Sequence, residues 1–163
     1  MSEAAMVRPG KSEEIAVACA IAKLAWEPIY EYRRQKMGDV LFNHLFADWR
    51  AGKAGEISSL CESRPEQFLV VEVEGEIKGF ATFLLDEEKS MGIIGNNAVH
   101  PDAQGQGLGK LLHQSVMDEF RRRGLKCAQV LTGLDPVHDA ARGSYLKAGF
   151  TCSFEYGIFH CEL

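Results

Sequence analysis

The stretch VHPDAQGQGLGK, from Val99 to Lys110, decides the fold because it joins a hydrophobic run to the start of an amphipathic one. It places glycines at alternate positions, at Gly105, Gly107 and Gly109. Each glycine costs roughly 0.5–1 kcal/mol relative to alanine in regular structure. Such a series therefore predicts that another group must approach the backbone closely at this point.

Residue patterns around the glycines predict alternating strands and helices. We expect a strand over 91–99 and then a helix, on which apolar residues recur at helical spacing from Leu108 to Phe120. Gly124 is expected to end that helix. The elements expected after it are a strand over 127–132, a helix over 138–148 and β structure from Phe150 onward.

The N-terminal half predicts helices followed by a hairpin. One helix should begin near Glu13 and be ended or kinked at Pro28, and others are expected over 40–52 and 56–62. The run FLVVEVEGEIKGFATFLL, residues 68–85, has two β-type segments around a short turn and predicts a β-hairpin. This order of elements predicts an α/β fold of the mixed α+β kind, with helices covering a mixed sheet.

Length and charge limit the classes of function. The chain of 163 residues fits a single domain, expected to span residues 1–163. A formal net charge of -5 argues against a nucleic-acid partner, which normally meets a basic face, and favours attraction of small cationic molecules.

Cysteine usage and hydropathy indicate where the protein works. The five cysteines are an odd number without a C-x-x-C pair, which favours free thiols in a reducing compartment over disulfides or zinc. The apolar run from Ile15 to Trp26 is interrupted by Lys23 and resembles neither a signal peptide nor a membrane span. We therefore expect a cytoplasmic protein without a membrane partner or a metal.

The glycine stretch opens a helix and so predicts an anion site, since a helix N-terminus exposes unpaired N–H groups and a partial positive charge. A Walker A motif is disfavoured by Gln104 and Leu111, and a dinucleotide fingerprint by Lys110. A nucleotide-binding domain and a turn without a ligand stay open as alternatives.

Two motifs resemble one family. Gln104, Gly107 and Gly109 match the Q/R-x-x-G-x-G/A signature of the GNAT superfamily of N-acetyltransferases. The later segment AARGSYLKAGF, residues 140–150, resembles the family's helix with a tyrosine and a lysine-x-glycine-phenylalanine ending. With the upstream hairpin, the resemblance covers roughly residues 68–150. It implies a central, mostly antiparallel mixed sheet flanked by helices.

The resemblance also implies acetyl-CoA as cosubstrate. The pyrophosphate would lie on the backbone of Gln104, Gly105, Gln106, Gly107, Leu108, Gly109 and Lys110. The pantetheine arm would run beside the strand at Asn97, Ala98 and Val99, where Asn97 replaces a more usual leucine or valine. His138 falls where many relatives carry an asparagine that contacts the cofactor, and it can donate the same hydrogen bond.

By the same resemblance, Tyr145 is the general acid that protonates the leaving thiolate, and its alternative is a tyrosine packed in the core. The acetyl group would pass directly to a primary amine in a ternary complex, and Glu27, His100 and His138 are candidates for the general base. A CoA-responsive binding module without catalysis is the alternative function.

The acceptor is left open between small-molecule and peptide amines. In this family the N-terminal helices form walls of the acceptor pocket. After Phe150 only the thirteen residues TCSFEYGIFHCEL remain, fewer than in many relatives. This end of the pocket would therefore be open, or completed by a second subunit in a homodimer.

Overall fold

The computed structural model describes residues 5–162. Its sheet contains the strands β1 (Met6–Pro9), β2 (Phe68–Val73), β3 (Glu76–Asp86), β4 (Met91–Val99) and β5 (Cys127–Val130). They lie in the order β1-β2-β3-β4-β5, and every neighbouring pair is antiparallel except the parallel pair of β4 and β5. The expected mixed, mostly antiparallel sheet is confirmed.

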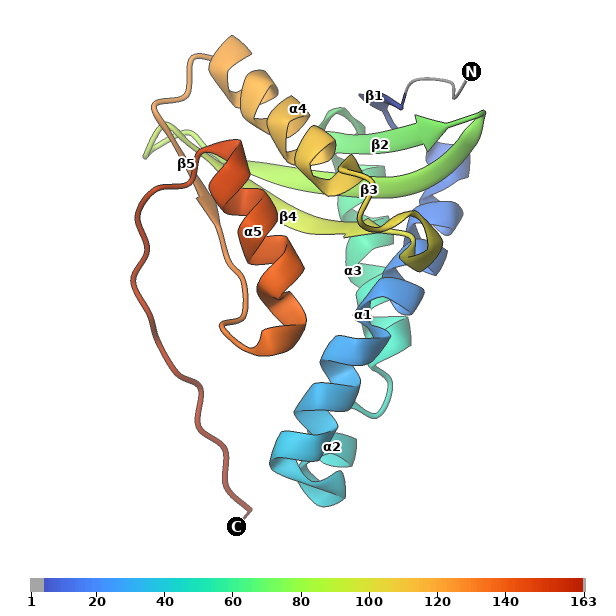
Figure 1. Cartoon of the computed structure of the whole chain (residues 1–163), viewed down its shortest axis with the longest axis vertical. Coiled ribbons are helices and arrows are strands. Elements are labelled where there is room, and N and C mark those ends of the chain that lie inside the picture. The colour runs from blue at the N-terminus through green and yellow to red at the C-terminus, as the bar shows by residue number, and fades with distance from the viewer. Residues whose placement is uncertain (1–4, 163) are drawn as a thin grey trace.

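Helices cover both faces of this sheet (Figure 1). The α-helices are α1 (Ile15–Met37), α2 (Asp39–Phe46), α3 (Trp49–Ser63), α4 (Leu108–Arg122) and α5 (Asp139–Ala148). α1 and α3 pack on one face, α4 packs on the other, and α5 lies against α4. Short 3-10 turns precede several of these elements, at Ser12–Glu14, Pro65–Gln67, Pro101–Ala103 and Pro136–His138.

The strands β2 and β3 are buried on both faces of the sheet, and they divide the core into two layers. Val70 and Phe80 belong to the layer packed against α1 and α3, whereas Val71 and Ala81 belong to the layer under α4. Successive strand residues point to opposite faces. This alternation explains why the hairpin reads as nearly continuous apolar sequence.

The N-terminal expectations need three corrections. The strand β1 was not predicted, because its four residues gain their hydrogen bonds from β2, which lies far along the chain. α1 does not end at Pro28 but continues through this exposed position between the buried Ala22 and Tyr30, so tertiary packing outweighs the one lost hydrogen bond. α3 runs through Gly52 without a break because its apolar face is anchored in the core.

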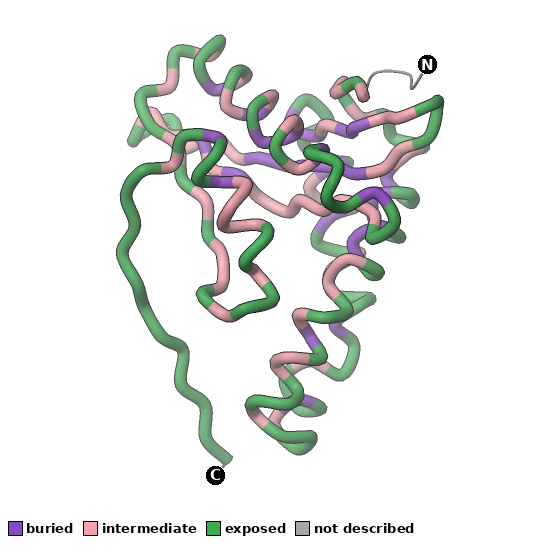
Figure 2. Tube along the Cα trace, viewed as in Figure 1, coloured by how far each residue is buried: buried purple, intermediate pink, exposed green. Residues whose placement is uncertain are grey.

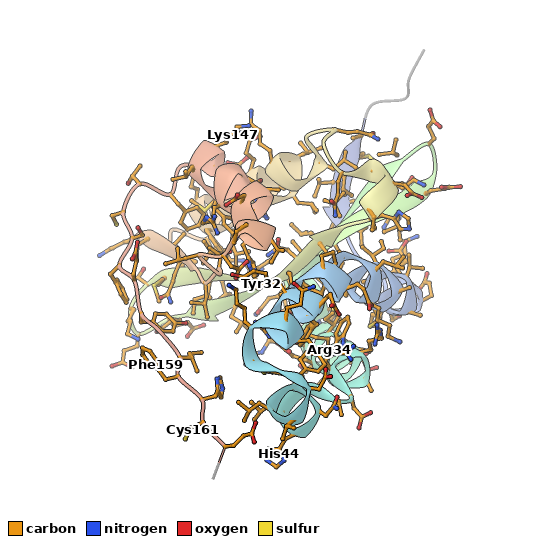
Figure 3. All side chains as sticks on the ribbon, turned by 60° about the horizontal axis from the view of Figure 1, so that its bottom comes forward. Tyr32, Arg34, His44, Lys147, Phe159 and Cys161 are labelled. Atoms are coloured by element: carbon orange, nitrogen blue, oxygen red, sulfur yellow. The ribbon has the colours of Figure 1, made fainter. Side chains whose placement is uncertain are left out.

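The expected terminal β structure is also corrected. Residues 151–162 form neither helix nor strand and are exposed throughout (Figure 2). Figure 3 shows Phe159 and Cys161 along this segment. A strand needs a neighbour for its hydrogen bonds, and among the described residues the edge strand β5 pairs only with β4. The apolar pattern of this segment therefore has no strand partner within residues 5–162.

One further observation concerns membranes. Across residues 5–162, no helix combines the length and the apolarity that crossing a bilayer would require.

Candidate functional site

A bulge in β4 separates this strand from β5. Gly95 and Asn96 together oppose the single residue Thr82, because Ala81 pairs with Asn97 and Phe83 with Ile94. The Thr82 hydroxyl donates to the Asn96 carbonyl oxygen at 3.1 Å. β5 follows β4 only as far as Ile94. Beyond Ile94, β5 therefore supplies no main-chain partner to β4 from Gly95 to Val99.

Only glycine fits the first position of this bulge. A Cβ atom on Gly95 would lie 2.8 Å from Thr82 Oγ1 and 3.2 Å from the Thr82 carbonyl oxygen. Bulges bend a strand and are common beside functional sites. The pairing of β4 with β5 ends at Ile94, directly before this bulge.

The glycine loop leads into α4 and presents its N-terminus. Gly105 and Gly107 have left-handed φ angles of +78° and +83°, and nothing lies within 4 Å of the Cβ position of either. The first intrahelical bond runs from the Leu111 N–H to the Gly107 carbonyl oxygen at 3.0 Å. The N–H groups of the preceding turn have no acceptor within the helix. The loop therefore has both the space and the donors that an anion needs.

The third glycine of the series serves a different purpose. Gly109 lies inside α4, and a Cβ atom there would meet Ser144 Oγ at 3.6 Å, an ordinary contact. An alanine would therefore fit at this position beside α5. Of the three glycines, only Gly105 and Gly107 are required by backbone conformation.

Gln104 ties the loop to the end of β4. Its side-chain Nε2 donates to the Val99 carbonyl oxygen at 3.1 Å, and its N–H donates to the Pro101 carbonyl oxygen at 3.3 Å. The Gln104 N–H is thus already engaged. Lys110, at the other end of the predicted cradle, is exposed.

Tyr145 lies under the bulge, on the α4 side of the sheet. Its side chain is buried, and its hydroxyl oxygen lies 3.2 Å from Asn97 Nδ2, which donates to it. Burial raises the pKa of Tyr145, and the hydrogen bond from Asn97 works in the opposite direction. A raised pKa keeps this hydroxyl protonated, so it can act as a proton donor.

Sequence reasoning missed His113, which lies on α4 against the Tyr145 ring with centroids 4.6 Å apart. Its Nε2 is 3.0 Å from Asn97 Oδ1 and its Nδ1 is 2.9 Å from Ser144 Oγ. Burial lowers the pKa of His113 to about 4. The signal in the sequence was its spacing from Val116 and Phe120, which places a histidine on the apolar face of the helix.

His138 lies two turns before Tyr145 and is held by its own loop. Its Nδ1 is 2.7 Å from Asp135 Oδ1. Burial acts to raise the pKa of Asp135, but the hydrogen bond and charge of His138 outweigh it and lower that pKa. Arg142 donates to the carbonyl oxygens of Gly133 and Asp135 and fixes the same loop.

The other two candidates for the base lie on different elements. Glu27 on α1 is half-exposed and forms an ion pair with Arg50 of α3. His100 follows β4, and its Nδ1 accepts from the Asp102 N–H at 3.2 Å. Glu27, His100 and His138 thus each contact a partner of their own, Arg50, Asp102 and Asp135.

A pocket of ≈ 500 Å³ lies between the N-terminal helices. Its walls include the stacked rings of Tyr30 and Trp49, together with Lys53 and Glu56. The last two residues connect it to the bulge, because Glu56 Oε1 accepts from Asn96 Nδ2 at 2.9 Å and Lys53 Nζ donates to Asn96 Oδ1 at 3.2 Å. Glu56 was also missed from the sequence. Over residues 5–162, no group of three or more His, Cys, Asp and Glu could hold a metal ion.

Comparison with known proteins agrees with this geometry. The model of the acetyltransferase (GNAT) family matches residues 20–150, most of the chain. The chain belongs to the GNAT acetyltransferase family. This GNAT domain is 32% identical over 94 residues to the IAA acetyltransferase of Azospirillum brasilense, an alignment that covers 57% of this chain and 60% of that relative.

Solved structures share the GNAT fold at low sequence identity. The PaiA N-acetyltransferase of Thermoplasma acidophilum, in complex with coenzyme A, superposes with a TM-score of 0.74 at 14% identity and covers 94% of each chain. A GNAT family acetyltransferase of Brucella melitensis, in complex with acetyl-CoA, gives a TM-score of 0.60 at 18% identity, over 91% of this chain and 84% of that one. These likenesses confirm the fold that the two motifs implied.

Proposed function

We propose that this GNAT domain transfers an acetyl group from acetyl-CoA to a primary amine by direct attack in a ternary complex. The observation that carries the proposal is the position of the Tyr145 hydroxyl beside Asn97, beyond the point where β4 stops pairing with β5. A protonated donor there could serve a thioester bound at the end of β4. The structures that resemble this chain include complexes with coenzyme A and acetyl-CoA.

The residues present fit such a cosubstrate. The pyrophosphate would be bound by the free N–H groups at the start of α4, with the open space at Gly105 and Gly107 allowing close approach. The amide arm would bind along β4 from Asn97 to Val99, which the described part of β5 does not pair with. His138 supplies a further polar group near the start of α5.

Each residue role follows from the bonds that change. The amine nitrogen bonds to the thioester carbonyl carbon, the carbon–sulfur bond breaks, and Tyr145 gives its hydroxyl proton to the departing sulfur. The phenolate regains a proton from solvent. An alkylammonium has an ordinary pKa near 10.4, so a base must accept a proton before attack, and Glu27, His100 and His138 stay the candidates.

The acceptor would enter from the pocket between the N-terminal helices. Asn96 and Asn97 are consecutive: Asn96 contacts Lys53 and Glu56 at the end of the pocket, whereas Asn97 contacts Tyr145. An amine in the pocket and a thioester at the end of β4 would therefore meet at the bulge. Aromatic walls with a carboxylate suit a small cationic or peptide amine.

Thermal unfolding with matched concentrations of acetyl-CoA, CoA, NAD and ATP tests the binding half of this proposal. A ligand at 100 times its Kd stabilises the native state by about 2.7 kcal/mol, so only the two CoA species should raise the unfolding midpoint. Gly107→Glu should abolish the rise, because it adds a negative charge and a side chain at a left-handed position. Gly143→Ala, in the open interior of α5, is the matched control.

Release of CoA in the presence of an amine panel tests the catalytic half. Tyr145→Phe should lower turnover by about 10²-fold or more while the acetyl-CoA midpoint shift remains. Binding without turnover on any amine would support the CoA-responsive module instead. A shift with ATP or NAD alone would overturn both.

A further inference from the structure

Four polar side chains from three elements form a continuous chain of hydrogen bonds beneath the bulge. Ser144 on α5 contacts His113 on α4 at 2.9 Å, and His113 contacts Asn97 on β4 at 3.0 Å. Asn97 in turn contacts the Tyr145 hydroxyl at 3.2 Å. His113 is 3% exposed and has no part in the proposed reaction so far.

One main-chain carbonyl group reveals the direction of every hydrogen bond in this series. Asn97 Nδ2 donates to the Gly95 carbonyl oxygen at 3.0 Å. Because a carbonyl oxygen only accepts, the amide nitrogen of Asn97 must be on that side, and its Oδ1 must face His113. His113 Nε2 therefore carries a hydrogen, which leaves Nδ1 of the neutral ring to accept from the Ser144 hydroxyl.

The same reasoning determines the state of the Tyr145 hydroxyl. The second hydrogen of Asn97 Nδ2 points at the Tyr145 oxygen, so this oxygen accepts a hydrogen bond from Asn97. The hydroxyl hydrogen of Tyr145 is not used in that bond. Among the described residues, the acceptor that this hydrogen could reach is Asn97 Oδ1. It lies 3.4 Å from the Tyr145 oxygen, beyond the normal range for an O–H···O bond. That oxygen already accepts from His113. The Tyr145 hydrogen is thus held weakly.

We infer that His113 is a positioning residue: held as the Nε2–H tautomer by Ser144, it keeps the Asn97 amide turned so that the Tyr145 hydroxyl hydrogen is free for the departing thiolate. The inference rests on the proposed function of Tyr145. In the transfer itself, the Tyr145 O–H bond breaks and an S–H bond forms, and no proton moves along the chain. His113 acts only through Asn97.

Two properties of the site keep this orientation in place. Burial holds the pKa of His113 near 4, so the ring stays neutral and Nδ1 stays an acceptor at neutral pH. The ring also packs against Tyr145 at 4.6 Å, with an interplanar angle of 36°. If the Asn97 amide turned over, its nitrogen would face the hydrogen on His113 Nε2 and its oxygen would face the Gly95 carbonyl oxygen.

The kinetic test uses two amides that copy different halves of the imidazole. His113→Gln places its amide nitrogen near the position of Nε2 and can still donate to Asn97, whereas His113→Asn reaches only the position of Nδ1. We expect His113→Asn to lower kcat about tenfold or more with the KM for acetyl-CoA within about twofold, and His113→Gln to stay within about threefold of wild type. Equal losses in both variants would overturn the inference.

A double-mutant cycle separates positioning from general damage. In a Tyr145→Phe background, which lacks the hydroxyl, His113→Asn should change kcat by less than about twofold, because the orientation no longer has a function. A tenfold loss that persists in that background would overturn the inference. If Tyr145→Phe alone turns over like wild type, the proposed role of Tyr145 fails by itself.

Nitrogen NMR of the unmodified protein labelled at histidine tests the chain without relying on activity or on the folding of a variant. The His113 ring should show a protonated Nε2 and an unprotonated Nδ1 from pH 8 down to pH 5. A protonated Nδ1 or a charged ring at pH 7 would overturn the inference even if Tyr145 proves to be the acid.

Discussion

His113 ties the stability of the protein to pH. Its pKa is lowered to about 4 by burial, against an ordinary value of 6.5. Between these two values the unfolded chain binds more protons than the native protein, so the free energy of unfolding falls as the pH falls from 6.5 towards 4.

His113→Gln removes this titration, so its stability should depend less on pH than that of wild type. We expect the difference in unfolding free energy between pH 7 and pH 4.5 to shrink by on the order of 2 kcal/mol. Urea unfolding at the two pH values measures it. His44→Gln is the control, since His44 is an exposed histidine on α2 (Figure 3). Equal pH dependence in His113→Gln and wild type would show that His113 titrates normally.

At the scale of single residues, the sequence predicted the site residues that lie in short motifs. It missed those whose role depends on contacts with distant parts of the chain. Tyr145 could be found because its segment resembles a known helix ending. His113 could not, because its partners Asn97 and Ser144 lie 16 and 31 residues away. A polar residue on the apolar face of a helix indicates a buried polar contact, but the sequence does not identify the residue that makes it.

Among the elements, the hairpin, β4, α4 and α5 were predictable from periodicity alone. The helices of the N-terminal half were harder, because Pro28 and Gly52 are local stop signals that packing overrides. β1 had no local signal, since its strand character comes from pairing with β2. Local sequence therefore predicted best those elements that carry a clear apolar pattern of their own.

Glycines in open surroundings should respond to alanine according to the backbone of their element. Gly55, inside α3, and Gly124, after α4, both have nothing within 4 Å of their Cβ positions, but only Gly124 has a left-handed φ of +75°. Gly55→Ala should raise the free energy of unfolding by about 0.4–1 kcal/mol, and Gly124→Ala should lower it by about 1 kcal/mol. Thermal unfolding of the two variants decides, and shifts of the same sign would contradict the assignment.

On the scale of the whole molecule, residues 151–162 lie outside both layers of the core. Phe154 and Phe159 are 89% and 95% exposed, whereas Phe150 still packs edge-on against Tyr145 with centroids 6.0 Å apart. The packed part of the C-terminal region therefore ends at Phe150.

Removing the chain after Phe150 should leave the unfolding midpoint within about 2 °C of the full chain, because the removed residues bury little apolar surface. Calorimetry combined with light scattering measures both stability and mass. A large fall in midpoint, together with a change from dimer to monomer, would show instead that this segment packs against a second copy.

The start of α4 offers an anion main-chain N–H groups and empty space instead of particular side chains. Exchanging Gln106 or Lys110 for another residue leaves those N–H groups where they are, whereas Gly105 and Gly107 allow few substitutes. Most side chains of this loop can therefore change during evolution while the main-chain N–H groups that could bind an anion stay in place. The PaiA structure and this chain, which agree at only 14% of positions, share the fold that presents such a helix start.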